Sequence, residues 1–357
     1  MFIVPENLKS EISYDINCKE WNNELLKNQA STVYQTSNWQ DIYKQTYDSK
    51  PFFITISKPN GKLLSQLGGI IHKKLFWNNA NLVASYIGNK LNLRTTLNWF
   101  HGPIIHDHDY QQEIITEILS CIDKISKDNK VAIATGISSP LEQSISNSSF
   151  TTFGYTIKPW TTYITNLQQD KEKLYNSLNK KTRYDYRKSQ QQELTFEIAD
   201  TRKSYDEFND LKLDARKNNG EKIKKNNMFF DAHREFLYEH DYEKLFLVRD
   251  NGKLIGGILG VIFNGNVIQH GVGISSSTKL LAGPSITWNS LQWCIDKKYS
   301  TFDMGGANPF PDSSKEKSID FFKSKWGGEK YCYNLYTKIF DKTKTKISSF
   351  IKNPKRF

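Results

Sequence analysis

One carboxylate in the last third of the chain stands where functional side chains are often found. Asp303 lies in an expected strand, Thr301–Met304, and two glycines, Gly305 and Gly306, follow at once. Glycines leave room for a substrate beside the backbone. The Asp303 carboxylate could therefore orient an attacking ammonium or accept its proton. The alternative is that Asp303 accepts hydrogen bonds from backbone N–H groups and so caps its own loop.

A second candidate, Lys323, belongs to an expected short helix, Asp320–Trp326, that ends at the glycine pair Gly327-Gly328. A cation in such a place can face a cleft, although an ordinary solvated lysine would fit the same pattern.

A run of alternating imidazoles and carboxylates, His106-Asp107-His108-Asp109, could place both histidines on one face of a strand, as a metal site requires. The interpretation adopted is a loop and helix cap before Tyr110, so no metal is predicted. The four cysteines are far apart and form no CxxC pair, which argues against a zinc finger and against a disulfide framework.

A strongly basic segment is expected to form one long helix over Asp170–Gln192. The basic side chains that share one of its faces by i, i+3, i+7 spacing are Lys180, Arg183 and Arg187. Two interleaved tyrosines, Tyr184 and Tyr186, could stack on bases or sugars. The net charge of +11 indicates an anionic partner: nucleic acid, phosphorylated lipid or a nucleotide-linked substrate. The alternative is a solvated surface helix.

The elements that must position these residues repeat along the chain. A length of 357 residues favours two domains. Two strand pairs are each joined through Asn-Gly, at residues 60–61 and 251–252, a dipeptide that favours a type I′ hairpin. Each hairpin follows two helix-like stretches, Lys19–Asn28 and Trp39–Tyr47 in the first half, Lys203–Asn218 and Phe229–His240 in the second. This order predicts two copies of one α/β domain.

The expected architecture of each copy is a mixed, mostly antiparallel sheet flanked by helices. No GxGxxG follows a strand, which argues against a Rossmann fold. We expect a first domain over residues 1–159, a second over residues 160–340 and a basic tail over residues 341–357.

Several of these residues together resemble the FemAB-type aminoacyltransferases. The matching segments are Trp160-Thr161-Thr162-Tyr163, Asn179-Lys180-Lys181-Thr182-Arg183, Asp303-Met304-Gly305-Gly306, Phe322-Lys323 and Trp326-Gly327-Gly328. The resemblance spans the second half and implies twin domains of the GNAT acyltransferase fold. No heptad segment for a coiled-coil arm is present, so the armless, FemX-type group is the closer match.

The resemblance implies transfer of an amino acid from aminoacyl-tRNA to an amine of a cell-envelope precursor, with no other cofactor. Lys323 would be the cation that stabilises the tetrahedral oxyanion. The resemblance also implies substrate contacts at Phe322, Trp288, Gly305 and Gly306. The first half departs from the family: an R-G-P-V-x-D motif is replaced by residues 101–106, which begin and end with histidine. His106 and the adjacent Asp107 are therefore the acceptor-side candidates, and the standard sugar-nucleotide pentapeptide is a weaker expectation as acceptor.

Two other functions stay open. An acyl-CoA-dependent N-acyltransferase acting on a sugar or peptide amine needs a pyrophosphate loop of the form [Q/R]-x-x-G-x-[G/A]. The corresponding stretch, residues 275–284, has a single glycine followed by Pro284, which lacks a backbone donor. This favours tRNA over acetyl-CoA as the donor carrier. The third function is a catalytically silent binding protein in surface-glycan assembly.

The chain is expected in the cytoplasm, at the inner face of the membrane. No apolar run approaches the roughly 18 residues of a membrane span, and the N-terminus lacks a secretory signal. The tail Lys342–Phe357 is basic, with Ile347, Phe350 and Ile351 on one stripe if it is helical. Such a segment could lie on an anionic leaflet.

Overall fold

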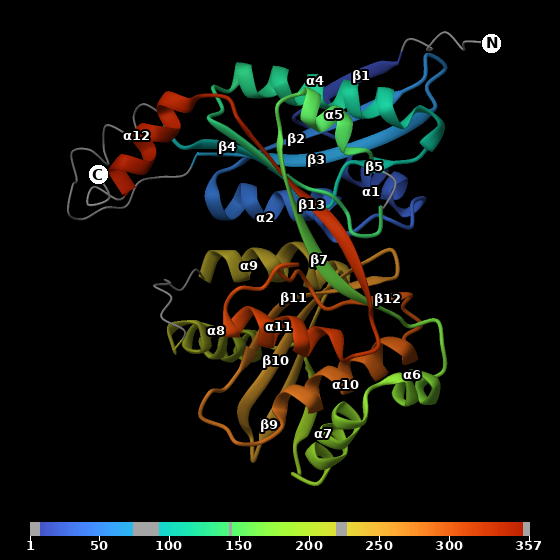
Figure 1. The fold of residues 1–357 in the computed structure, drawn as a ribbon, viewed down its shortest axis with the longest axis vertical. Helices are drawn as coiled ribbons and strands as arrows, with labels where there is room; N and C mark the ends of the chain where they lie inside the picture. Colours follow the sequence, from blue (N-terminus) through green and yellow to red (C-terminus); the bar gives the residue numbers. More distant parts are fainter. Residues whose placement is uncertain (1–7, 74–92, 143–144, 219–226, 353–357) are drawn as a thin grey trace. The chain divides into compact units, whose positions relative to one another are not determined.

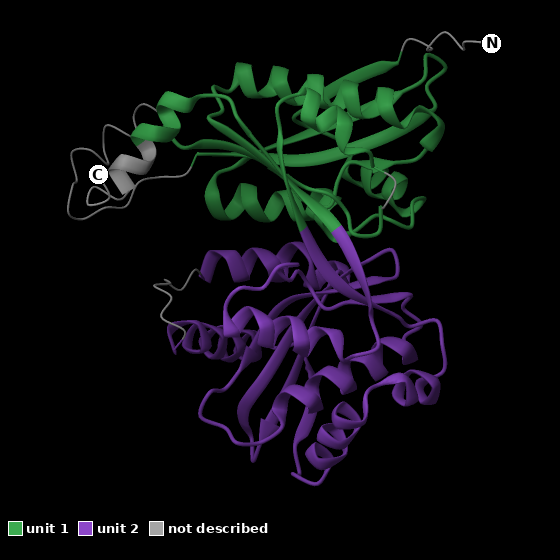
Figure 2. Cartoon of the chain, viewed as in Figure 1, with its two compact units in different colours: residues 1–159, 333–357 green, residues 160–332 purple. Residues whose placement is uncertain are grey.

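The computed structural model describes residues 8–73, 93–142, 145–218 and 227–352. The chain forms two compact units (Figure 2): unit 1 comprises residues 1–159 and 333–357, and unit 2 comprises residues 160–332. The sequence-based division ended the second domain at residue 340 and separated a tail. In the structure residues 333–357 belong to unit 1, because the final strand pairs with a unit 1 strand and buries Tyr336 in its core.

Unit 1 is built on a mixed sheet whose strands follow the order β1-β2-β3-β4-β6-β13 (Figure 1). Only β4 and β6 are parallel neighbours in this order. The strands are β1 (Lys9–Ser13), β2 (Lys50–Ser57), β3 (Leu63–Lys73), β4 (Thr95–Trp99), β5 (Ile104–Ile105), β6 (Ile133–Ile137) and β13 (Glu329–Ile339). The helices are α1 (Cys18–Leu26), α2 (Ser37–Tyr47), α4 (Gln111–Asp128), α5 (Asn147–Thr152) and α12 (Lys342–Lys352), with short 3₁₀ turns η1 (Val33–Gln35) and η2 (His108–Tyr110).

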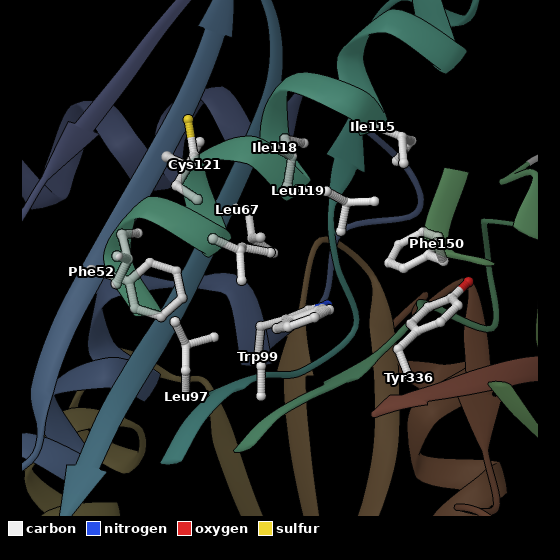
Figure 3. Packing of buried hydrophobic residues seen from close by; sticks show 14 of the residues in the cluster. Phe52, Leu67, Leu97, Trp99, Ile115, Ile118, Leu119, Cys121, Phe150 and Tyr336 are labelled. Atoms are coloured by element: carbon white, nitrogen blue, oxygen red, sulfur yellow. The ribbon is translucent and has the colours of Figure 1, made fainter. Parts of the chain in front are cut away.

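The unit 1 core lies between the sheet and α4, which carries buried isoleucines and leucine at helical spacing (Figure 3). Phe150 of α5 stacks on Tyr336 of β13, with ring centroids 3.7 Å apart and planes 8° from parallel. Packing is so close at Gly136 of β6 that a Cβ there would lie 1.8 Å from the Trp99 indole ring. The last strand of the chain is therefore an integral part of this core.

Unit 2 has the same kind of sheet, with the order β7-β12-β11-β10-β9-β8. Its strands are β7 (Thr156–Asn166), β8 (Thr195–Ala199), β9 (Glu243–Asp250), β10 (Lys253–Phe263), β11 (Asn266–Ile274) and β12 (Thr301–Asp303). Its helices are α6 (Lys171–Ser177), α7 (Lys180–Gln190), α8 (Arg202–Asn218), α9 (Asn227–Phe236), α10 (Ala282–Asp296) and α11 (Ser314–Ser324), with a 3₁₀ turn η3 (Tyr238–His240).

Strand β9 is buried on both faces. Phe246 and Val248 belong to a core cluster with residues of α10, whereas Leu245 and Leu247 pack with Phe208 of α8. Successive side chains of a strand point to opposite faces, so the apolar run of β9 supplies two layers. Helices α8 and α10 therefore cover opposite faces of the unit 2 sheet.

The parallel pair β11 and β12 is short, and its end positions the candidate site. Pairing covers Asn266–Ile268 of β11 and Thr301–Asp303 of β12, whereas β11 continues along β10 to Ile274. After Asp303 the chain turns away through Gly305, whose φ is +76°. Ligands commonly bind where the carboxyl ends of parallel strands separate.

Two local expectations need correction. The basic segment forms two helices, because Leu178 is extended and the Asn179 side chain accepts a hydrogen bond from the Thr182 N–H, which starts α7 afresh. The hairpin at 251–252 has positive φ at both residues, as type I′ requires, but in the first hairpin only Gly61 does. Both hairpins nevertheless join antiparallel neighbours, β2 with β3 and β9 with β10.

Candidate functional site

Asp303, at the end of β12, is buried, and its carboxylate is held by two donors. The Thr162 hydroxyl of β7 and the Gly305 N–H both donate to Oδ1, the latter at 2.7 Å. Burial raises the pKa of Asp303, and the two hydrogen bonds and the charge of Lys323 partly oppose that rise. The expected loop cap is thus present in the structure. A catalytic role for Asp303 remains a prediction.

Lys323 of α11 extends over the two glycines that follow Asp303. Its Nζ donates to the carbonyl oxygens of Gly305 and Gly306, both at 2.8 Å. Burial lowers the pKa of Lys323 to about 8, although the charges of Asp303 and Asp320 oppose that change. An ammonium has three N–H donors, and these two carbonyls use two. The third N–H makes no hydrogen bond within the part of the chain that the structure describes.

The backbone at Gly305 explains why a glycine stands there. Its positive φ disfavours a side chain, and a Cβ would lie 3.0 Å from the Gln269 carbonyl oxygen and 3.6 Å from Lys323 Nζ. The Gln269 amide in turn donates to the Met304 carbonyl oxygen at 3.3 Å. The predicted residues Asp303, Gly305, Gly306 and Lys323 are therefore brought together where β11 and β12 separate.

Phe322 and Trp288 are placed differently from this cluster. Phe322 packs edge-on against Trp326 with ring centroids 5.8 Å apart, and a Cβ at Gly283 would lie 3.7 Å from its ring. Trp288 of α10 is buried with 2% of its surface exposed. It lines a cavity of about 500 Å³ between α6, α7 and α10, together with Tyr175 and Tyr186. Substrate contact by Phe322 stays a prediction.

The three basic side chains on one face of α7 differ in their surroundings: one is bound to backbone carbonyls and two are exposed to solvent. Arg183 donates to the carbonyl oxygens of Asn176 and Leu178, at 2.6 and 2.7 Å, and so caps the end of α6. Lys180 and Arg187 are exposed. Of the two tyrosines, Tyr184 is 55% exposed and Tyr186 is buried. Two of the three predicted cations therefore remain accessible to phosphates.

The acceptor-side candidates lie in unit 1 and make local contacts. His106 Nε2 is 3.1 Å from Gln66 Oε1, and burial lowers the pKa of His106. Asp107 accepts from Lys62 at 2.9 Å and begins η2 by accepting from the Asp109 N–H. The hydrogen bond from Lys62 is the main cause that lowers the pKa of Asp107. Within the described residues, no group of three or more His, Cys, Asp or Glu side chains could hold a metal ion.

The loop before α10 is unlike a phosphate cradle. The Leu281 N–H donates to Gln192 Oε1 at 2.8 Å, and the Leu280 N–H donates to Thr278 Oγ1 at 3.1 Å. Leu281 is the N-cap residue of α10, so its N–H is one of the four at the helix start that have no partner within the helix, and Pro284 offers no N–H. The backbone donors that a pyrophosphate would need are thus partly used within the protein.

Several residues of the site were not predicted from the sequence. Thr162 holds Asp303, and its only signal was its place in the segment that resembles the FemAB pattern. Gln190 and Gln292 line the cavity beside Trp288, and Tyr186 and Gln190 share a helix face by i, i+4 spacing. In the tail, Ile347 of α12 is 43% exposed, whereas the side chains of Phe350 and Ile351 lie outside the described residues. None of the described helices has the length and apolar character to cross a membrane.

The fold and part of the sequence are similar to known acyltransferases. Residues 176–317 match the family model of the acetyltransferase (GNAT) domain. FemX is similar in structure with a TM-score of 0.70 at 14% identity, over 91% of this chain and 96% of FemX. A tandem GNAT protein from the clavulanic acid biosynthesis pathway has a TM-score of 0.57 at 10% identity, over 93% of this chain and 98% of its own. L-PGS from Bacillus licheniformis has a TM-score of 0.54 at 11% identity, over 94% of this chain and 96% of its own.

No curated protein sequence is significantly similar to the chain. At such low identities the structural likenesses establish the fold. They span nearly the whole chain, and each unit has the expected mixed, mostly antiparallel sheet flanked by helices. The prediction of two GNAT-like domains is confirmed, and the chain has the tandem GNAT acyltransferase fold that FemX also has.

Proposed function

We propose that this protein is an aminoacyltransferase that moves an aminoacyl group from aminoacyl-tRNA to an amine of a cell-envelope precursor. The observation that carries the proposal is the Lys323 ammonium, fixed by the Gly305 and Gly306 carbonyls beside Asp303 with one N–H donor left over. A preorganised cation of this kind suits a reaction in which negative charge develops on a carbonyl oxygen.

In the proposed reaction the acceptor amine attacks the ester carbonyl carbon of the donor. A C–N bond forms, the C–O bond to the ribose breaks, the amine loses a proton and the ribose oxygen gains one. The third N–H of Lys323 stabilises the tetrahedral oxyanion. Asp303, whose pKa is raised by burial, orients the acceptor ammonium and accepts its proton. Fixed positions for both groups reduce the entropy cost of bringing the reactants together.

The donor carrier is supported by two features of unit 2. The exposed cations of α7 suit a polyanion such as tRNA. At the start of α10 the Leu281 N–H is bound by Gln192 and Pro284 has no N–H, which leaves fewer backbone donors for the pyrophosphate of coenzyme A. The second candidate is an acyl-CoA-dependent N-acyltransferase, and the observation in its favour is the acetyltransferase-domain match of residues 176–317.

One experiment compares the two donors. Purified protein is incubated with a labelled aminoacyl-tRNA pool and, separately, with labelled acetyl-CoA, in the presence of envelope-precursor extracts. The proposal expects amide-linked label from tRNA and a loss of about 10²-fold in rate for Lys323→Met.

The matched control is Lys317→Met, which removes an exposed lysine from the same helix and is expected to retain full rate. Label that reaches the acceptor only from acetyl-CoA would contradict the tRNA proposal. Full turnover by Lys323→Met would contradict the assignment of the site.

A further inference from the structure

The cavity between α6, α7 and α10 has the lining of a small-molecule site. Its volume of about 500 Å³ lies within the range of known ligand pockets. Its apolar part is aromatic: the Trp288 ring centroid is 5.2 Å from that of Tyr175 and 5.9 Å from that of Tyr186, at steep angles. Tyr175 is half-buried, so part of its ring is open to an occupant.

The polar part of the lining consists of side-chain amides. Asn176, Gln190 and Gln292 each offer both donors and acceptors. Gln190 also donates to the Tyr186 hydroxyl at 2.8 Å, which fixes both side chains. Trp288 is almost fully buried and contributes apolar ring surface to this lining.

Charge within the cavity is balanced. Lys171 and Glu172 are its two ionic lining residues, and Lys171 donates to Asp296 at 2.6 Å. A phosphate is therefore not attracted into the cavity itself. A neutral ring with hydrogen-bonding edges matches this lining better.

The cavity continues the exposed basic face of α7. Gln190 follows Lys180, Arg183 and Arg187 at i+10, i+7 and i+3, so all four lie on one side of the helix. Asn176, another lining residue, has its carbonyl bound by Arg183. Cations that track a backbone beside an aromatic, amide-lined pocket are the recurring arrangement for single-stranded nucleic acid.

We propose that this cavity holds one base of a single-stranded RNA end, with the ring against Tyr175, its edge on the Gln190 and Gln292 amides, and the adjoining phosphates on Lys180 and Arg187. The inference deepens the proposed function, since the 3′ end of the tRNA donor would be the natural occupant. It identifies α6, α7 and α10 as the elements that bind the 3′ end of the tRNA donor.

The test measures binding of the RNA trinucleotide 5′-CCA-3′ to the full chain by calorimetric titration. The comparison ligands are the same trinucleotide without its last base, and N-acetylglucosamine. We expect the abasic form to bind at least tenfold more weakly than the intact one, in line with the loss of one stacked base. Tyr175→Ala and Gln292→Leu should remove that difference, and Tyr175→Phe should keep it because the ring remains.

Arg187→Gln should weaken both trinucleotides equally and reduce the salt dependence of binding. Lys253→Gln, at the exposed first residue of β10, is the charge-matched control and should change neither trinucleotide affinity nor its salt dependence. Equal binding of the intact and abasic forms, or cavity variants that affect only N-acetylglucosamine, would overturn the inference.

The outcome is separable from that of the proposed function. Base-dependent binding that the cavity variants abolish supports the cavity even if no aminoacyl transfer is observed. Transfer from tRNA at an unchanged rate in Tyr175→Ala would leave the enzyme assignment standing and remove the cavity from it.

Discussion

Lys323 and Asp303 are coupled through the glycine turn between them. The lysine ammonium donates to the Gly305 carbonyl oxygen, and the N–H of the same glycine donates to the Asp303 carboxylate. Each side chain is thus fixed by the opposite side of one residue's backbone. Their charges also act on each other, since each favours the ionised form of its partner. Substitution of one residue should therefore change the titration of the other.

The first prediction concerns pH. The pKa of Lys323 is lowered to about 8, so the ammonium predominates at pH 7 and is lost as the pH rises through 8. If the cation stabilises the oxyanion, kcat should fall across that interval. Single-turnover rates between pH 6 and 9.5 measure the effect. Lys323→Met should be slower by about 10²-fold and should lack this alkaline decrease. An identical decrease in the variant would assign it to another group.

The second prediction concerns Asp303→Asn. Removing the carboxylate charge removes an effect that raises the pKa of Lys323, so the alkaline decrease in kcat should move to lower pH. An unchanged midpoint would contradict the coupling.

The free energy of unfolding of Asp303→Asn should also differ from that of the wild type in a way that depends on pH. The raised pKa of Asp303 means that folding opposes its ionisation, so the native state loses stability as pH rises from the ordinary value of 3.8 through the folded pKa. Asp303→Asn should equal or exceed the wild type in free energy of unfolding at pH 7. That advantage should disappear in acid, where the Asp303 carboxyl of the wild type is protonated in both the folded and the unfolded state. Urea unfolding at pH 7 and pH 3 measures both.

The third prediction separates two arginines of α7. Arg183 donates to two backbone carbonyls at the end of α6, so Arg183→Gln should lower the free energy of unfolding by about 1–2 kcal/mol, discounted for its partial exposure. Arg187 is exposed, and Arg187→Gln should leave stability within about 0.5 kcal/mol. Its effect should be on tRNA affinity and the salt slope. Equal losses of stability in the two variants would contradict this division.

The fourth prediction concerns the unit 1 core. A Cβ at Gly136 would lie 1.8 Å from the Trp99 ring, which is itself fully buried. Gly136→Ala should therefore destabilise by about 3 kcal/mol or more, at or beyond the usual cost of overpacking. Gly154→Ala is not an equivalent control because of its positive φ. Thr135→Ser, on the same strand, is suitable. Thermal unfolding of the three proteins compares them.

The features that could be predicted from the sequence are those that depend on neighbouring residues or on a regular spacing. Two Asn-Gly hairpins, each preceded by two helices, were enough to predict two copies of one fold. A strand that ends in two glycines was enough to place Asp303 at a turn. The break between α6 and α7 was missed because charge and leucine spacing run through it. Its signal was Asn179 three residues before Thr182, a helix-start pattern inside an apparently continuous helix.

The contacts that make the site are mostly not periodic. No spacing indicates that Lys323 reaches the carbonyl oxygens after Asp303, because that contact depends on how α11 returns across the end of β12. The cavity likewise needs side chains of three helices from distant parts of the chain. Resemblance supplied Lys323, and only three-dimensional structure supplied Tyr175, Gln190 and Gln292.

The division of the chain has a consequence for biosynthesis. Unit 2 is one continuous stretch, residues 160–332, set inside a unit 1 that is complete only when residues 333–357 have been made. A ribosome therefore releases all of unit 2 before it releases β13, whose Tyr336 closes the unit 1 core. Since domains fold as units during synthesis, the unit that begins first must finish last. Until β13 has been synthesised, the edge of β6 lacks its antiparallel partner and Phe150 lacks the Tyr336 ring that stacks on it.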